Sequence, residues 1–185
     1  MKSKKNGKYT ITKSETVYKN PWIKVTQDTV VRPNGENGIF GTIDMLAGST
    51  VLPVDEDLNV YLSCEFQYAL GKESLECMSG GMNKNETPLA CAKRELAEEL
   101  GISAKEWTAL DYTDPFTSLI RSKDHMFLCR NLAFGTSANE ATEKIILVKI
   151  PLDVALQKVM SGEITHATSC VLILKVAMLL QQKKL

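Results

Sequence analysis

The chain has 185 residues, of which 44% are hydrophobic and 24% charged, and its 22 basic residues balance 22 acidic ones. This composition predicts a compact domain with a full core, and zero net charge gives no support for nucleic acid or a membrane surface as partner. The longest apolar stretch, Cys170–Leu180, contains Lys175 and is too short to span a bilayer, and the basic start, Lys2 to Lys8, is followed by no apolar run. We therefore expect a cytoplasmic protein without a signal peptide.

The cysteines do not indicate a metal site or a disulfide framework. They are five in number, far apart and without a C-x2-C pair: Cys64, Cys77, Cys91, Cys129 and Cys170. An odd set of this kind predicts buried free thiols in a reducing compartment. The only histidines, His125 and His166, neighbour no candidate nucleophile, so a Ser/His or Cys/His mechanism has little support.

The first quarter of the chain predicts an antiparallel unit, residues 1–45. Alternating and β-branched residues predict strands at Tyr9–Ile11, Ile23–Val31 and Ile39–Met45, with the polar segment 32–38 as a turn. Residues 46–185 form the predicted main domain. Its first two strands, Ser49–Pro53 and Val60–Glu65, resemble a second pair of strands, divided by the polar turn 55–57.

Strands and helices then alternate. A short strand that ends at Glu76–Met78 leads into the glycines at 80 and 81, and a helix is predicted at 88–100. The remaining predictions are strands at Trp107–Tyr112, His125–Leu132 and Lys144–Ile150, a helix at Leu152–Met160 ended by Gly162, and a final helix after Thr165. This order predicts an α/β fold in which a mixed β-sheet is sandwiched between α-helices.

The helix at 88–100 has clear boundary signals. Thr87 can cap it, Pro88 suits its first position, and Gly101 stands where a left-handed residue ends a helix. At about 100° per residue, one stripe is apolar and is expected to face the core: Leu89, Ala92, Leu96 and Leu100.

The same helix carries a cluster of carboxylates. Glu95 and Glu99 point the same way, and Glu98 lies four residues after Arg94, so these two can pair across one turn. Carboxylates without nearby histidines or thiols suit Mg²⁺ first and Mn²⁺ second, and the loop Ser79–Gly81 can bring backbone groups close to the ion or to a phosphate. The alternative for the glutamates is a solvated acidic surface.

The full spacing of residues 80–102, GGMNKNETPLACAKRELAEELGI, resembles the Nudix box, G-x5-E-x7-R-E-U-x-E-E-x-G-U, at every fixed position. The resemblance implies hydrolysis of a nucleoside diphosphate linked to another moiety, with water attacking phosphorus beside divalent metal ions. It also implies roles for the box residues. Glu95, Glu98 and Glu99 would bind metal with the Ser79 carbonyl, Gly80 would shape the loop, Arg94 would orient the glutamates, and Glu86 would support loop and helix.

The flanking segments are similar to the ADP-ribose and nucleoside diphosphate sugar branch of this family. They are NPWIKVTQDTVVRPNGENGIF, EFQYALGKESLECMSGG and SGEITHATSCVLIL. In that branch the N-terminal strands cross to a second subunit and help to form its base-binding cleft. The resemblance therefore implies a homodimer, with Trp22 stacking on the base. The alternative for Trp22 is packing at the interface without touching ligand.

Other candidate substrate and catalytic residues follow from the same resemblance. Branch members place a water-orienting glutamate in the loop that here spans 135–143, which makes Glu143 the first choice and Glu140 the second; the alternative is plain surface charge. A proline downstream of the box corresponds to Pro115, followed by Phe116, although an ordinary loop turn would explain it equally well.

The chain also departs from the branch pattern. Gln67 stands where an arginine is usual, and Cys77-Met78 stands where Leu-Pro is usual. The loop after Pro115 lacks a clear match, although Arg121 can recover a phosphate contact. These changes leave the base and the sugar open.

The leading hypothesis is a Mg²⁺-dependent pyrophosphohydrolase that cleaves a nucleoside diphosphate sugar or ADP-ribose to a nucleoside monophosphate and a sugar phosphate. One alternative is hydrolysis of a modified nucleoside triphosphate, which the long N-terminal segment disfavours. Another is a catalytically silent sensor of nucleotide sugars, which has no need of Arg94 and all four box glutamates.

Overall fold

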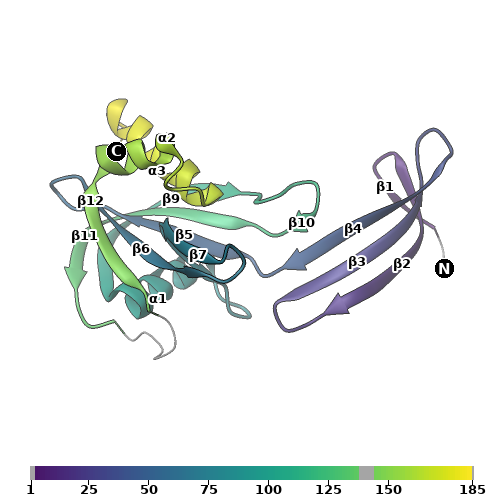
Figure 1. Ribbon diagram of the computed structural model, residues 1–185, viewed down its shortest axis with the longest axis horizontal. Coiled ribbons are helices and arrows are strands. Elements are labelled where there is room, and N and C mark those ends of the chain that lie inside the picture. The colour runs from purple at the N-terminus through teal and green to yellow at the C-terminus, as the bar shows by residue number, and fades with distance from the viewer. Residues whose placement is uncertain (1–2, 138–143, 185) are drawn as a thin grey trace. The chain divides into compact units, whose positions relative to one another are not determined.

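The computed structural model describes residues 3–137 and 144–184 (Figure 1). Contacts between Cα atoms divide the chain into two compact units. The smaller unit comprises residues 1–46 and 114–123, and the larger unit comprises residues 47–113 and 124–185. The segment 114–123 therefore belongs with the N-terminal strands although it follows the box helix by more than ten residues.

The described strands of the smaller unit form one sheet in the order β1-β2-β3-β4-β10. They are β1 (Lys4–Asn6), β2 (Tyr9–Lys19), β3 (Ile23–Val31), β4 (Asn37–Met45) and β10 (Ile120–Arg121). β1 to β4 pair antiparallel, whereas β10 pairs with β4 in parallel. The predicted antiparallel unit is confirmed, and its first long strand continues well beyond Ile11, to Lys19.

The larger unit contains two sheets. The first has the order β8-β5-β11-β9 and is formed by β5 (Gly48–Pro53), β8 (Met78–Gly81), β9 (Ile102–Thr113) and β11 (Asp124–Phe134). The second has the order β12-β6-β7 and is formed by β6 (Asn59–Gln67), β7 (Lys72–Glu76) and β12 (Ile146–Pro151). β5 and β11 are parallel, and the other pairs are antiparallel, so the predicted mixed sheet is confirmed.

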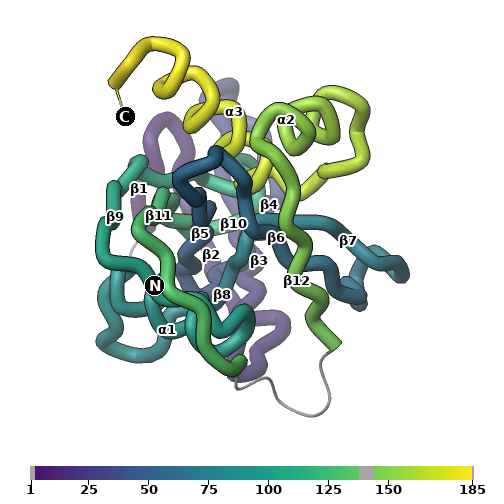
Figure 2. Tube along the Cα trace, turned by 90° about the vertical axis from the view of Figure 1, so that its left-hand side faces the viewer, coloured from purple at the N-terminus to yellow at the C-terminus, as the bar shows by residue number. Residues whose placement is uncertain are grey.

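Helices cover these strands on opposite sides (Figures 1 and 2). They are α1 (Pro88–Leu100), α2 (Leu152–Ser161) and α3 (Ala167–Gln181). The consecutive residues Val51 and Leu52 of β5 point to opposite faces and are fully buried in different core clusters. Val51 packs with Leu96 of α1, and Leu52 belongs to the cluster that contains Leu172 of α3.

Two strand predictions were wrong. Ser49–Pro53 and Val60–Glu65 do form strands, but they belong to different sheets and meet only at the bridge between Val54 and Val60. The short strand predicted to end at Glu76–Met78 ends at Glu76, and after Cys77 the chain enters a new strand in the other sheet. Both errors concern partners that are chosen by packing over long sequence distances rather than by local pattern.

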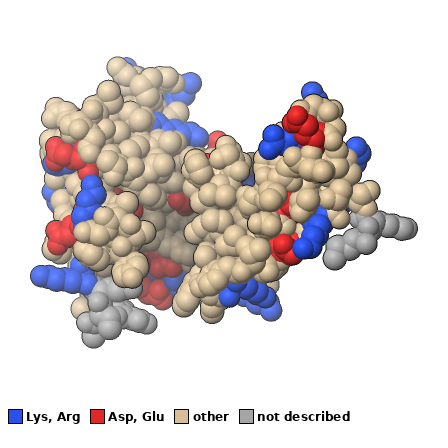
Figure 3. All heavy atoms as spheres, turned by 45° about the vertical axis from the view of Figure 1, so that its right-hand side comes forward, with Lys and Arg blue, Asp and Glu red and all other residues tan. Residues whose placement is uncertain are grey.

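The cysteines are free thiols, as predicted: Cys77, Cys91 and Cys129 are buried, and Cys64 and Cys170 are half-buried. Burial raises the pKa of Cys77 and of Cys129 to about 12, so these thiols stay protonated. Within the described residues, no helix is long and apolar enough to cross a membrane. Figure 3 shows acidic and basic side chains interspersed over the visible face, in keeping with the zero net charge.

Candidate active site

The box helix has the predicted boundaries. Thr87 accepts a hydrogen bond from the Ala90 amide at 3.2 Å, Pro88 occupies the first turn, and Gly101 ends the helix with a φ of 63°. The predicted apolar stripe is wrong at one position, because Leu89 is 36% exposed while Cys91 is buried instead. The buried face of α1 is therefore rotated slightly about the helix axis from the predicted face, toward Cys91.

Arg94 is the centre of the acidic cluster. Its Nε and Nη2 donate to the two oxygens of Glu86, each at 2.9 Å, and its Nη1 donates to Glu95 at 2.6 Å and to Glu98 at 3.1 Å. Nη2 also donates to the Gly81 carbonyl at 3.0 Å. The predicted pairing of Arg94 with Glu98 is confirmed, and one guanidinium holds three carboxylates and the glycine loop together.

Glu86 connects the segment before α1 to the helix itself. Its carboxylate accepts the forked pair of bonds from Arg94 and a further bond from the Asn83 amide at 2.8 Å. The Arg94 hydrogen bonds, with the Asn83 amide, lower the pKa of Glu86 to about 2. Glu86 is therefore ionised at neutral pH and fixed in place.

Glu95 lies against the glycine loop. A Cβ built on Gly80 would stand only 2.1 Å from the Glu95 Cδ, so only a glycine leaves room for this carboxylate. The Glu95 side chain is 12% exposed, and burial raises its pKa more than Arg94 lowers it. A carboxylate this poorly solvated gains from a nearby cation.

The loop itself is an edge strand. β8 pairs with β5, with Ser79 opposite Thr50 and Gly80 opposite Ser49. The Ser79 hydroxyl donates to the Cys77 carbonyl at 3.1 Å and lies 2.9 Å from the Thr50 hydroxyl. Sheet pairing and these hydroxyl contacts together determine the position of the Ser79 backbone.

The donor types at this site fit Mg²⁺ or Mn²⁺. The Glu95, Glu98 and Glu99 carboxylates and the Ser79 carbonyl are hard oxygen donors, and the absence of a side chain at Gly80 lets Glu95 lie against the glycine loop. In the described residues, no group of three or more His, Cys, Asp or Glu side chains is arranged to hold a metal ion; Glu95 and Glu98 point to Arg94. Mg²⁺ commonly binds through one or two carboxylates plus waters and substrate phosphates, so a complete protein cage is not required.

The structure does not bring the predicted substrate residues into one unit. Trp22, Phe116 and Arg121 lie in the smaller unit, where Trp22 and Phe116 are exposed and Arg121 forms an ion pair with Asp44. Gln67 lies in the larger unit, on β6.

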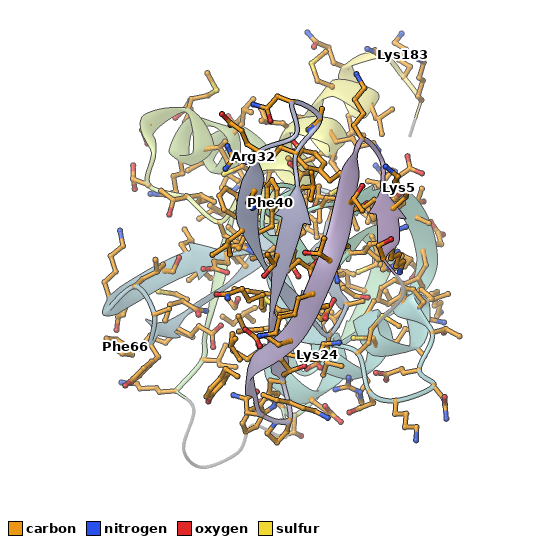
Figure 4. All side chains as sticks on the ribbon, turned by 90° about the vertical axis from the view of Figure 1, so that its right-hand side faces the viewer. Lys5, Lys24, Arg32, Phe40, Phe66 and Lys183 are labelled. Atoms are coloured by element: carbon orange, nitrogen blue, oxygen red, sulfur yellow. The ribbon has the colours of Figure 1, made fainter. Side chains whose placement is uncertain are left out.

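The side-chain amide of Gln67 donates a hydrogen bond to the Glu65 carboxylate at 2.7 Å. The neighbouring Phe66 is exposed on the same hairpin (Figure 4). The two loop candidates for orienting water, Glu140 and Glu143, lie outside the described residues.

The smaller unit contains a cavity of about 250 Å³ that sequence reasoning missed. Tyr9 and Phe40 contribute to its wall, with their rings in edge contact at 5.1 Å, and Phe40 projects from β4 (Figure 4). Asp28 also lines it and is only 6% exposed. Among the described residues, Asp28 Oδ1 and Thr42 Oγ1 have no hydrogen-bond partner. In the sequence, the signal for this cavity is that Asp28 and Val30, two positions apart, lie on the same face of one strand. This pattern does not tell whether that face lines a cavity or is exposed to solvent.

Asp124 is a second residue that the sequence did not single out. It is the first residue of β11, and its carboxylate accepts a hydrogen bond from the Thr50 hydroxyl at 2.9 Å. Because the Thr50 hydroxyl also lies 2.9 Å from the Ser79 hydroxyl, Asp124 is connected to Ser79 through Thr50. A carboxylate immediately before an apolar strand is a weak signal, because most such residues are solvated ends of strands.

Comparisons with known proteins agree with this geometry. Residues 9–43 match the family model described as the nucleoside diphosphate sugar hydrolase N-terminal domain, and residues 47–160 match the NUDIX domain. The ADP-ribose pyrophosphatase of Bacillus subtilis (strain 168) is 29% identical over 158 residues, covering 83% of this chain and 84% of that protein. The methanol dehydrogenase activator of Bacillus methanolicus is 26% identical over 150 residues, covering 78% and 80%.

A solved structure of an ADP compounds hydrolase superposes with a TM-score of 0.82 at 22% identity, covering 99% of this chain and all of that one, which shows the shared fold. The NUDIX match alone spans more than half of the sequence and contains the complete box around Arg94. The chain therefore belongs to the Nudix hydrolase family and carries the N-terminal domain of its nucleoside diphosphate sugar hydrolases.

Proposed function

We propose that this Nudix enzyme is a Mg²⁺-dependent pyrophosphohydrolase of a nucleoside diphosphate sugar or ADP-ribose. The observation that carries the proposal is the arrangement around Arg94, which holds Glu86, Glu95 and Glu98 in one cluster, with Glu95 packed against Gly80. The matched N-terminal domain and the relative named ADP-ribose pyrophosphatase support this substrate class over a triphosphate.

The reaction adds water to one phosphorus of the diphosphate and breaks the bond from that phosphorus to the bridging oxygen. The products are a nucleoside monophosphate and a sugar phosphate. Bound Mg²⁺ would neutralise charge on the phosphate oxygens and lower the pKa of water. Glu95, Glu98, Glu99 and the Ser79 carbonyl would hold it, and Glu143, or else Glu140, would accept the proton of the attacking water.

The chain's own residues preorganise this chemistry. Arg94 keeps mutually repelling carboxylates within one turn of α1, and the fully ionised Glu86 keeps Arg94 in place from the opposite side. The glycine loop is fixed by pairing of β8 with β5. Such preorganisation lowers the reorganisation needed when charge develops on the phosphate.

We further propose that the smaller unit recognises the base and joins two copies into a homodimer. Asp28 and Thr42 offer hydrogen-bond acceptors inside the cavity, which suits the amino group of a base, and Tyr9 and Phe40 provide aromatic surface. Exposed apolar side chains on the same unit support self-association: Val17, Tyr18, Trp22, Ile39, Met45 and Leu46. Light scattering would then give a mass of two chains.

The direct test is a panel of nucleotide sugars, ADP-ribose, dinucleotides and nucleoside triphosphates, with and without Mg²⁺, assayed by phosphate release through a coupled phosphatase. We expect Mg²⁺-dependent monophosphate products from the sugar nucleotides. Release of pyrophosphate from a triphosphate would indicate the alternative hydrolase. Stabilisation against heat by a nucleotide sugar without any turnover would indicate the sensor.

A single substitution tests the assignment of the glutamates. Glu99→Gln removes one charge and should lower turnover by about 10²- to 10³-fold, as expected when a group that stabilises the transition state is lost. The exposed Glu106→Gln is the control and should leave turnover unchanged. Normal turnover in a folded Glu99→Gln protein would contradict the role of Glu99.

A further inference from the structure

Cys77 is the residue at which the chain changes sheets. β7 ends at Glu76 in one sheet, and β8 begins at Met78 in the other. Cys77 is fully buried between them, so its backbone amide has neither a place in a strand ladder nor access to water. A buried amide of this kind requires another acceptor, since leaving it unpaired is costly.

Ser169, in the first turn of α3, supplies that acceptor. Its hydroxyl oxygen accepts the Cys77 amide at 2.8 Å, across 92 positions of sequence, and Ser169 is itself fully buried. Helix α3 is therefore bonded directly to the crossing point that precedes the glycine loop.

His166 and Glu76 fix the orientation of this serine. His166 Nδ1 lies 2.8 Å from the Ser169 hydroxyl and 3.2 Å from a Glu76 carboxylate oxygen. With its proton on Nδ1, the imidazole donates toward both groups, and the Ser169 oxygen accepts from Cys77 and His166 together. Glu76 is buried, so this contact also compensates for its loss of water.

The Cys77 carbonyl is fixed as firmly as its amide. It accepts the Ser79 hydroxyl at 3.1 Å, and that hydroxyl is 2.9 Å from the Thr50 hydroxyl, which donates to Asp124. The amide and the carbonyl of Cys77 are thus both hydrogen-bonded to serine hydroxyls. Only Met78 separates Cys77 from Ser79, so a displacement of Cys77 would also displace the Ser79 carbonyl in β8.

We propose that Ser169 and His166 are positioning residues for catalysis, which set the place of the Ser79 carbonyl and of the glycine loop through Cys77. The inference rests on the proposed function, because it takes that carbonyl as part of the metal site. Neither residue needs to touch substrate. Their effect passes through one buried backbone amide.

The test measures Mn²⁺ binding to the substrate-free protein by electron paramagnetic resonance, together with Mg²⁺-dependent turnover. Ser169→Ala leaves the Cys77 amide unpaired, and we expect Mn²⁺ to bind about tenfold more weakly, the lower end of the effect of outer contacts on metal sites. The Mg²⁺ concentration for half-maximal turnover should rise in the same proportion, while KM for the nucleotide at saturating Mg²⁺ stays unchanged.

Thr113→Val is the matched control. The Thr113 hydroxyl lies 3.0 Å from that of the buried Thr168, the neighbour of Ser169 on α3, whereas the backbone of Cys77 is hydrogen-bonded to Ser169 and Ser79. Thr113→Val should lower thermal stability much as Ser169→Ala does and leave Mn²⁺ affinity unchanged. A purely structural role for Ser169 would instead make the two variants behave alike.

His166 provides a second pair of variants that does not depend on tolerance of change inside the core, because its side chain is 30% exposed. His166→Ala should weaken Mn²⁺ binding, and His166→Asn, whose amide nitrogen can replace Nδ1, should restore it. The positioning role alone would be overturned if the wild-type protein is active and Ser169→Ala binds Mn²⁺ with the wild-type affinity. If Ser169→Ala does not fold, the same result in His166→Ala would overturn it. A wild-type chain that neither binds Mn²⁺ nor hydrolyses any nucleotide would overturn the proposed function as well.

Discussion

The Glu95 carboxylate lies so close to the backbone of Gly80 that a Cβ on Gly80 would stand 2.1 Å from the Glu95 Cδ. The next residue, Gly81, is different, since a Cβ there would meet no described atom within 4 Å. The described contacts therefore require a glycine at position 80 but not at the adjacent position 81, and the difference can be measured.

Gly80→Ala should lower turnover by about 10²-fold, because the methyl group must push Glu95 away from its position and displacements near 1 Å have effects of this size. Gly81→Ala should remain close to wild type. Steady-state kinetics of the two variants at saturating Mg²⁺ makes the comparison, and equal activity would show that the Glu95 position is not needed.

Arg94→Lys should weaken the site although the charge is kept. A lysine cannot provide the forked pair of bonds to Glu86 while also reaching Glu95, so the carboxylates lose their common partner. We expect the Mg²⁺ concentration for half-maximal turnover to rise about 10- to 100-fold. Arg32→Lys, an exposed change in the smaller unit, is the control, and the same Mg²⁺ requirement in both variants would argue against the role of Arg94.

Asp55 should make the stability of the protein depend on pH. Burial raises its pKa, but Lys149 and hydrogen bonds from Asn59 and Tyr61 lower it further, so that the net pKa lies well below the usual range. A lowered pKa stabilises the fold above the unfolded value of about 3.9, and the contribution is lost as pH falls below that value. Asp55→Asn should therefore melt at a lower temperature than wild type at pH 7.

The difference in melting temperature between Asp55→Asn and wild type should shrink as the pH falls from about 5 toward 2. Asp57→Asn, in the same turn, should keep the wild-type pH dependence. A constant difference between Asp55→Asn and wild type over the whole range would mean that the ionised form of Asp55 does not stabilise the fold.

Trp22→Ala separates the two roles expected of this side chain, which is 68% exposed next to the turn that Asn20 caps. If Trp22 stacks on the base, KM should rise about two- to tenfold with kcat and molecular mass unchanged. The neighbouring exposed Lys19→Ala is the control and should change neither KM nor mass. A mass reduced to one chain with an unchanged KM would assign Trp22 to the subunit interface instead.

Local features of the active site could be read directly from the sequence. The start of α1 at Thr87 and Pro88, its end at Gly101, and the pairing of Arg94 with Glu98 all follow from contacts within four residues. Their energies depend on caps and helical spacing, which are the same in any fold. For this reason the boundaries of α1 and the pairing of Arg94 with Glu98 were predictable.

Tertiary structure alone decided which distant groups surround the glycine loop. No local pattern indicates that β5 and β6 enter different sheets, that Ser169 bonds to the Cys77 amide, or that Thr50 bonds to Asp124. Such contacts are selected by the packing of two whole sheets and their helices, since a strand pattern defines a buried face without defining its neighbour. The box residues and their order were thus determined by the sequence, whereas the groups that hold the loop in place were determined by the fold.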